Sequence, residues 1–542
     1  MIKTSVLIVG GGPVGLNLAL NLAWWESPCL LVNDKPDTPV HPQGNSHNAR
    51  TMEHYRRLGI ANEIRKVGLP PKHCGDAIFV TRINGYELGR IVLPTNAERL
   101  APEFPELKLT PEPTHRASQM YVEAILKKHA EAQELIDLRF GYRMLKFSQF
   151  ENHVTAEIEN IITGKRETVT CDYMVGCDGG LGSIRKTIGI DYEGKSGREV
   201  DFMMGQMLSI YFSAPKLYTI MKTKPPWQFH TVNRDGRTSI VGLDGKGSFL
   251  AWAKVPADEN IEDIDPKPII FAAVGEELPV EIISAKPWIA GLSLIAESYG
   301  QGRVQLAGDA AHLFTPTGGF GMNTGVEDAT NLAWKLAALN HGWGGPKLIE
   351  SYQAERRPIA IRNLAQSYAL ADIKSAISVP EGVEDTGHDG DYTRQVLGHR
   401  FMTDLAEEYK CIGIQLGAQY ITTPLIQSDG SEPPDDNPYV FIPSATPGCR
   451  SPHAWMADGT AIFDHFGKWF TLLRFDETIP IEEFCSVAAS VGVPVKVLSV
   501  PESLRVYYEA NLVLIRPDQY VAWRGKTIPR DPLALLNKVI GF

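Results

Sequence analysis

A glycine-rich turn near the start of the chain constrains the fold more than any other feature. The apolar run at residues 6–9 precedes the turn 10–15, and leucines and alanines at helical spacing follow up to residue 23. A second apolar run at residues 29–32 completes the spacing of a βαβ unit. Within the turn, Gly10, Gly12, Pro13, Val14 and Gly15 are the predicted contacts, because bare backbone and a helix N-terminus suit a pyrophosphate.

A second strand, turn and helix occur together in residues 302–358. Residues 304–306 are apolar, and Gly308 and Asp309 form the turn. The loop that opens the next helix contains the other candidates, Pro316, Gly319, Gly321, Met322 and Asn323. Taken alone, this stretch is better explained as a plain connection with a capping aspartate. Beside the first turn it predicts a seat for an anionic, polyhydroxylated cofactor, with Asp309 on a hydroxyl and the loop amides facing negative charge.

Four motifs in collinear order resemble one known family. They are the turn 10–15, the segment 177–186 with its Asp-Gly pair, the segment 303–323, and a C-terminal set at residues 447–455, 470–473 and 514–524. The first three resemble the group A flavoprotein monooxygenases, the FAD-dependent aromatic hydroxylases. The C-terminal set is similar to the thioredoxin-like domain of phenol hydroxylase relatives.

The resemblance implies an α/β fold with three domains and a helical linker. A Rossmann-type FAD-binding domain is expected at residues 1–75, 109–195 and 288–375, and an inserted antiparallel sheet that binds substrate at 76–108 and 196–287. A helical linker is expected at 376–437 and a thioredoxin-like α/β domain at 438–542. Alternating apolar and polar residues support the inserted sheet, and residues 233–237 predict a hairpin turn within it.

Further cofactor contacts follow from the same resemblance. The spacing from Gly15 puts Asn33, with Asp34 next to it, where the family has an acid on the adenosine ribose. The resemblance also places Arg50, Arg116, Gln119 and Asp178 at the FAD site. Two positions depart from the family pattern, since Gln43 stands where many members have arginine and Gly182 stands where they have serine.

Composition excludes several other classes of protein. A chain of 542 residues predicts two or three domains. The formal charge of −11 argues against a nucleic-acid surface and against attraction to anionic lipid. No membrane span or signal peptide is expected, and the cytoplasm is the default compartment. Seven scattered cysteines without a C-x-x-C pair predict neither a disulfide framework nor a metal site. A homodimer is expected by analogy.

The resemblance implies an FAD- and NADH- or NADPH-dependent monooxygenase that hydroxylates a phenolic ring with O₂, through a flavin C4a-hydroperoxide. His47 and His230 are the candidates for the base that activates the phenol, and a loop histidine bonded to backbone is an equally good interpretation of His47. Two alternatives stay open. One is a Baeyer-Villiger or other oxygenation on the same scaffold, and the other is a protein that binds flavin and an aromatic compound without catalysis.

Overall fold

The first domain of the computed structural model, which describes residues 2–195, 205–221, 224–255 and 260–542, is built on a parallel sheet. Its parallel strands are β1 (Ile2–Val9), β2 (Cys29–Asn33), β7 (Ile136–Phe140), β10 (Arg166–Gly176) and β19 (Val304–Leu306). They run in the order β19-β10-β1-β2-β7. Their apolar runs are continuous because a parallel sheet is buried on both faces.

Helices and antiparallel strands complete this domain. The helix α1 (Pro13–Trp24) packs against α8 (Phe320–Asn340) and α5 (Gln119–Glu131). The strands β8 (Tyr142–Gln149) and β9 (Val154–Asn160) extend the sheet beyond β10, and β18 (Gly300–Gln301) borders β19. Shorter elements carry much of the site: β3 (Ser46–His47), α2 (Ala49–Arg57), β6 (His115–Arg116), α6 (Ser183–Thr187), β11 (Tyr192–Lys195), β17 (Ser293–Ala296) and β20 (His312–Leu313).

The carboxyl ends of neighbouring strands bring distant segments of the chain to one edge of the parallel sheet. Gly10 follows β1, Asn33 ends β2, Asp178 lies just beyond β10, and Gly308 lies just beyond β19. Since these four strands are adjacent and parallel, the segments emerge side by side. The chain leaves β1 toward β2 on one side and returns in β10 on the other. Open α/β sheets bind ligands at such a switch point.

A second sheet has seven strands and lies at the far end of the molecule. Its order is β16 (Glu281–Ala290), β12 (Gly205–Ser213), β15 (Ser248–Lys254), β14 (Gly236–Gly242), β13 (Gln228–Asn233), β4 (Ala77–Val80) and β5 (Glu87–Ile91). The predicted hairpin at residues 233–237 is confirmed as the β13–β14 turn. Phe229 and Ile240 face α7 (Pro266–Val274) in one apolar cluster, so the alternate residues of these strands form the opposite face.

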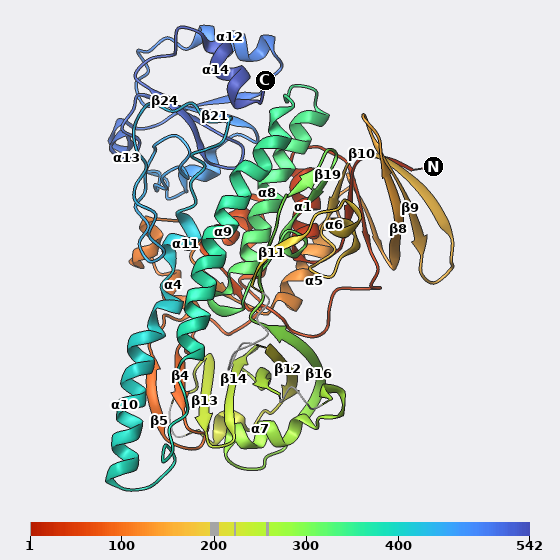
Figure 1. The fold of residues 1–542 in the computed structure, drawn as a ribbon. Helices are drawn as coiled ribbons and strands as arrows, with labels where there is room; N and C mark the ends of the chain where they lie inside the picture. Colours follow the sequence, from red (N-terminus) through yellow and green to blue (C-terminus); the bar gives the residue numbers. More distant parts are fainter. Residues whose placement is uncertain (1, 196–204, 222–223, 256–259) are drawn as a thin grey trace.

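The C-terminal part carries its own sheet, in the order β22 (Val495–Ser499), β21 (Phe470–Arg474), β23 (Leu512–Ile515) and β24 (Val521–Gly525). The helices α12 (Glu482–Ser490) and α14 (Pro532–Val539) pack together beside it. Before it come α9 (Lys347–Ser375), α10 (His388–Asp404) and α11 (Ile412–Leu416). Figure 1 shows this part and the seven-stranded sheet at opposite ends of the molecule, with α9 running between them.

The predicted fold class is confirmed: a Rossmann-type domain, an inserted, mainly antiparallel sheet and a C-terminal α/β domain. The strands β4 and β5 come from the first predicted insert and join β13 from the second, although β13 pairs with β4 in parallel. The residue boundaries of the domains stay predictions. Within the described ranges, no helix has the length and apolarity needed to cross a membrane.

Candidate functional site

The turn between β1 and α1 leaves the helix amides open. Gly10 has a φ of +115°, and a Cβ there would lie 2.1 Å from the carbonyl oxygen of Cys177, so only glycine fits. No side chain caps the N-terminus of α1, and a Cβ on Gly12 would meet no described atom within 4 Å. The unpaired first amides of α1, among them those of Val14 and Gly15, therefore face space that an anionic group can occupy.

The two residues predicted to hold the ribose lie in different surroundings. The side-chain oxygen of Asn33 accepts a hydrogen bond from the backbone amide of Gly11 at 3.0 Å. Asp34 is exposed, and its carboxylate lies 3.3 Å from the ammonium of Lys35. The structure therefore brings Asn33 to the glycine turn and leaves Asp34 at the surface. A cofactor contact for either residue stays a prediction.

Asp309 lies in the turn Gly308–Ala310 that follows β19. Its side chain is exposed, yet protein surrounds the carboxylate closely enough that burial raises its pKa. The hydroxyl of Tyr192 donates a hydrogen bond to the Asp309 carbonyl at 2.5 Å and fixes the backbone. Gly308 has a φ of +62°, and a Cβ there would lie 2.7 Å from Cγ2 of Val14, so this turn packs directly on α1. The two glycine-rich motifs are therefore in contact.

A fully buried carboxylate holds the second turn from beneath. One oxygen of Asp328 accepts a hydrogen bond from the Gly308 amide at 3.3 Å and lies 2.6 Å from Nε2 of His312. The other oxygen accepts a hydrogen bond from Nε of Arg356 at 2.8 Å. Charge-assisted bonds of this kind are strong when water is excluded. The arginine and histidine hold the pKa of Asp328 below its ordinary value against the effect of burial.

The loop before α8 presents backbone rather than side chains. Gly318 and Gly319 have φ of +81° and +67°, and α8 starts at Phe320 without a side-chain cap. The amide of Asn323 donates to the carbonyls of Ser46 and Gly319 at 2.9 and 2.7 Å, and its oxygen accepts from the Asn48 amide at 2.9 Å. Asn323 therefore ties the loop to β3.

Because the side chain of Asn323 is already used within the protein, the helix start can offer a ligand only backbone amides. Those of Gly321 and Met322 belong to the first turn of α8, where such amides have no partner within the helix. Pro316 lies one residue before the short helix Thr317–Gly319 that precedes α8. The positions of these predicted residues suit a ligand with negative charge, and their contacts with a cofactor stay predictions.

Asp178 caps α6 and keeps one oxygen free. Its Oδ2 accepts a hydrogen bond from the Ile184 amide at 3.1 Å, while Oδ1 is buried with no partner among the described residues. A Cβ on Gly182 would lie 2.2 Å from the carboxyl carbon of Asp178. This close approach is the physical reason for glycine where the family has serine. The free oxygen suits a ligand hydroxyl.

The three remaining cofactor candidates all make contacts within the protein. The guanidinium of Arg50 donates to Glu53 and to Gln519 at 2.7 Å each, so it faces the C-terminal domain. Gln119 donates to Glu123 at 2.6 Å, and its backbone amide donates to the carbonyl of Gly44 at 2.7 Å. Gln119 thus holds the loop that contains Gly44.

Arg116 stacks on the ring of Trp227, with its guanidinium carbon 3.9 Å from the ring centroid. Trp227 directly precedes β13, so this arginine faces the seven-stranded sheet. An FAD contact for Arg50, Gln119 or Arg116 stays a prediction.

The two candidate bases are both buried. His47 has no exposed surface, and neither ring nitrogen has a hydrogen-bond partner within the described ranges. Burial lowers the pKa of His47 to about 3. His230 stacks on Phe79, lies 3.2 Å from the hydroxyl of Tyr409 and also has a pKa well below its ordinary value because of burial. Both rings are therefore neutral at pH 7, and the burial of His47 argues against contact with a substrate.

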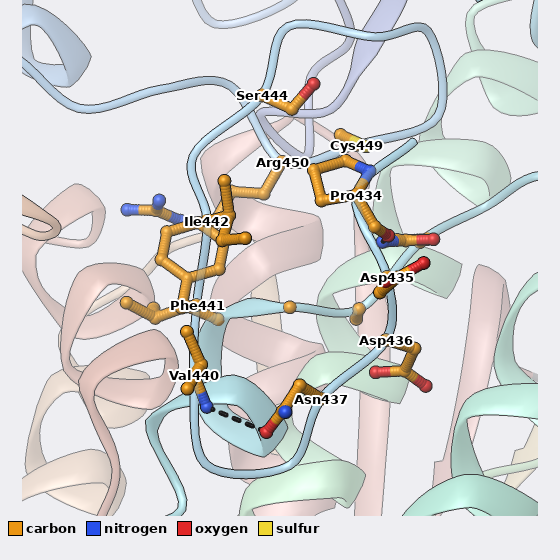
Figure 2. A pocket seen from close by; sticks show the side chains of 14 residues that line it. Pro434, Asp435, Asp436, Asn437, Val440, Phe441, Ile442, Ser444, Cys449 and Arg450 are labelled. Atoms are coloured by element: carbon orange, nitrogen blue, oxygen red, sulfur yellow. Dashed lines mark hydrogen bonds between the residues drawn. The ribbon is translucent and has the colours of Figure 1, made fainter. Parts of the chain in front are cut away.

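Two hollows lie elsewhere in the molecule. One, of about 20 Å³, is in the linker near Pro434 and Phe441, and it has room for about one water molecule (Figure 2). The other, of about 230 Å³, lies between Trp24, Arg57 and Phe463, at the C-terminal domain. None of the predicted cofactor residues lines either hollow. The glycine turns and the free oxygens mark the cofactor site more directly.

The residues at the carboxyl edge fit a flavin dinucleotide. The open amides of α1 suit a pyrophosphate, the exposed Asp309 and the free oxygen of Asp178 suit hydroxyl groups, and the uncapped α8 suits negative charge. Comparisons with known proteins agree. Residues 3–367 match the family model of the FAD binding domain, and residues 444–541 match that of the aromatic-ring hydroxylase C-terminal domain.

Individual relatives cover nearly the whole chain. The FAD-dependent monooxygenase apdD of Emericella nidulans is 29% identical over 97% of this chain and 88% of its own. The FAD-dependent monooxygenase opdD of Penicillium oxalicum is 31% identical over 89% of this chain and 95% of its own. The solved structure of RebC soaked with chromopyrrolic acid, with bound 7-carboxy-K252c, is similar with a TM-score of 0.90 and 34% identity. It covers 100% of this chain and 99% of that one.

The fold and the carboxyl-edge site define a flavin-dependent oxygenase. The chain belongs to the family of FAD-dependent aromatic-ring monooxygenases.

The sequence did not point to the residues that support the site from behind. Asp328 lies on α8, Arg356 on α9, and Tyr192 on β11, and none has a motif of its own. The available signal was a charged residue inside an otherwise apolar helical face, because such a residue is rarely buried unpaired.

Proposed function

We propose that this chain hydroxylates a phenolic ring, with NAD(P)H as the electron donor and O₂ as the source of the oxygen atom. One observation carries the proposal. Glu408 accepts a hydrogen bond from the Gly318 amide at 3.3 Å, and the hydroxyl of the next residue, Tyr409, donates to Gln228 of the sheet at 2.9 Å. Two adjacent residues thus connect the loop before α8 to the face of the seven-stranded sheet that is turned away from α7. The aromatic substrate would lie between that loop and that face.

The face of the sheet toward the flavin turns is polar and aromatic. Gln228 donates to Ser239 at 3.2 Å, and His41 lies 3.0 Å from the hydroxyl of Ser209 and 2.7 Å from that of Ser284. Side chains of this kind orient a planar phenol, while the buried sheet behind them excludes water.

The chain supplies orientation, charge and proton transfer, and bound FAD supplies oxygen activation. The first amides of α8 would hold the part of the cofactor that carries negative charge. Of the two candidate bases, His230 is joined to the polar face through Tyr409, and we keep it as the proposed route for the phenol proton. Its lowered pKa suits a relay rather than a lasting imidazolium.

The experiment is NADH and NADPH oxidation by the FAD-loaded protein, with O₂ uptake and peroxide followed together, over phenols of one to four rings. A phenol that stimulates oxidation with little peroxide and gains a ring hydroxyl supports the proposal. Insertion of oxygen into a ring, seen by nuclear magnetic resonance of the product, supports the Baeyer-Villiger alternative instead. Flavin and aromatic binding without oxidation of either nucleotide would contradict both.

The role of Asp309 in this proposal has its own test. We expect Asp309→Ala to weaken FAD binding at least tenfold, because the exposed carboxylate loses its bond to a cofactor hydroxyl. Equilibrium dialysis against FAD measures the dissociation constant. Asp172→Ala, which removes an exposed carboxylate from β10, is the matched control and should leave the constant unchanged. Equal FAD affinity in both variants would remove Asp309 from the site.

A further inference from the structure

Arg116 is a half-buried cation that bonds no acid among the described residues. It ends β6, opposite Ser46 of β3, and lies three residues before Gln119, the first residue of α5. The face of its guanidinium lies on the ring of Trp227, with 3.9 Å from the guanidinium carbon to the centroid. Among the residues that the structure describes, no carboxylate or carbonyl accepts a hydrogen bond from it. A stacked guanidinium keeps the N–H groups of its edge free, so Arg116 can still bind a planar acid at two points.

Two acids near Arg116, Glu106 and Glu408, lie beside other cations, and one oxygen of Glu106 is buried without a hydrogen-bond partner among the described residues. Glu106 lies 3.7 Å from Arg99, and Glu408 lies 3.3 Å from Lys374. Within the described part of the chain, neither acid makes a hydrogen bond or an ion pair with Arg116. Burial and the neighbouring Arg99 lower its pKa to about 10, so the cation lies where water solvates it poorly. Such a charge gains more from an anionic partner than a surface arginine does.

The same arginine borders the face of the sheet where the substrate is proposed to lie. The ring of Tyr409 stands edge-on to that of Trp227 at 6.3 Å, and its hydroxyl contacts both Gln228 and His230. The backbone of Arg116 pairs with that of Ser46 in the next strand. The side chain of Ser46 lies next to Gly319, in the loop before α8. Arg116 therefore lies between the loop before α8 and the aromatic residues Trp227 and Tyr409.

We propose that Arg116 is a specificity-determining residue, and that the aromatic substrate carries a carboxylate that it binds. This inference rests on the proposed function for the identity of the bound ring, and names the substrate class as aromatic acids. Trp227 holds the guanidinium flat, and the carboxylate accepts two parallel hydrogen bonds from its edge. The aromatic part of the acid then lies toward Tyr409 and Gln228.

The test compares an acid with its neutral counterpart. The FAD-loaded protein, without NAD(P)H, is titrated with 3-hydroxy-2-naphthoate and with 2-naphthol, and binding is followed by the change in flavin absorbance. We expect wild type to bind the acid at least tenfold more tightly than the naphthol. In Arg116→Met the acid should lose at least tenfold in affinity while the naphthol changes less than twofold. Arg116→Lys, which keeps the charge without the fork, should recover part of the preference.

Controls separate substrate binding from flavin binding and folding. Arg143→Met removes an exposed arginine from β8, in the sheet that does not carry Trp227, and it should keep the preference for the acid. FAD content and thermal unfolding are measured for each variant. No preference for the acid in wild type, an unchanged preference in Arg116→Met, or loss of FAD from both Arg116 variants would each overturn the proposal. Because no turnover is needed, a preference for the acid without NAD(P)H oxidation would retain this inference and contradict the proposed function.

Discussion

At the scale of single residues, buried charged groups separate into paired and nearly unpaired ones. Glu123 on α5 is 1% exposed, and its one hydrogen bond comes from Gln119 at 2.6 Å. Burial raises the pKa of this carboxyl to about 7. The group is therefore protonated in the folded state over a range of pH in which the unfolded chain would ionise it. The backbone amide of Gln119 also holds the loop that contains Gly44, so Gln119 links the Glu123 carboxyl to that loop.

We expect this carboxyl to make stability fall as the pH rises. Between about pH 4.5 and pH 7 the folded state binds the proton and the unfolded state does not, so the free energy of unfolding decreases with pH and levels off above 7. Glu123→Gln removes the ionisation while keeping an oxygen for Gln119. Its advantage should be near zero at pH 4.5 and about 3 kcal/mol at pH 8, from about 1.4 kcal/mol per pKa unit.

Thermal unfolding from pH 4.5 to pH 8 measures the effect as a difference in midpoint between wild type and Glu123→Gln. Glu350→Gln, an exposed carboxyl on α9, is the control and should follow wild type at every pH. A difference between wild type and Glu123→Gln that stays constant over the range would show that the Glu123 carboxyl does not titrate there.

At the scale of elements, α8 joins the two flavin turns. Gly325 on α8 allows the Gly308 turn and Val14 of α1 to approach closely, since a Cβ there would lie 2.6 Å from Cγ2 of Val14. Three residues further along, Asp328 holds the Gly308 amide, His312 and Arg356. One face of one helix therefore positions the turn that presents Asp309.

We expect Asp328→Asn to destabilise the fold and to loosen the flavin turn. The substitution leaves Arg356 with Glu327 as its remaining carboxylate partner, at 3.1 Å. Removing one partner of a buried charged pair costs about 3–5 kcal/mol. Urea unfolding measures the stability, and dialysis against FAD measures the affinity, which should fall together with it. Glu350→Gln, which removes an exposed carboxylate from α9, tests whether the loss of any carboxylate acts alike and should leave both quantities unchanged. If Asp328→Asn unfolds like wild type, this carboxylate does not support the turn.

Hydrophobic periodicity located β1, α1, β2 and β19, because apolar runs bounded by glycine are local signals. The pairing of β4 with β13, about 150 residues apart, has no local signal. The glycine turns were visible as patterns, whereas the role of Arg50 was assigned from position in a motif. In the structure its partners are Glu53 and residues of the C-terminal domain, and pairing over that distance cannot be inferred from spacing.

At the scale of the whole molecule, the C-terminal domain is joined to the flavin domain by buried charges. Arg516 makes two hydrogen bonds to Glu355 of α9, at 2.7 and 2.8 Å, and Arg450 pairs with Glu53 of α2. Lys335 of α8 also bonds Glu355 at 2.7 Å. None of these five side chains is more than 2% exposed. These contacts make the C-terminal domain a structural part of the flavin site.

We expect Arg516→Met to cost about 3–5 kcal/mol, because Glu355 keeps its charge in a buried place with one cation instead of two. Combining it with Glu355→Gln should recover part of the loss, since the uncompensated charge is removed. Urea unfolding of the two single variants and the double variant gives the coupling energy between the residues. Strictly additive losses would mean that the pair does not join the domains.

The 29-residue helix α9 has a proline in its middle, and this divides its contacts into two groups. Before Pro358, Tyr352 bonds the carbonyl of Leu306 and Arg356 bonds Asp328, so this half carries the Gly308 turn. After it, Ser367 bonds the carbonyl of Thr317, and the carbonyl of Lys374 accepts from Arg237 of the sheet. Because proline cannot donate to the carbonyl four residues earlier, the helix bends most easily there. The half of α9 that fixes the Asp309 turn is therefore joined to the half that reaches the substrate sheet at a point where the helix lacks an internal hydrogen bond.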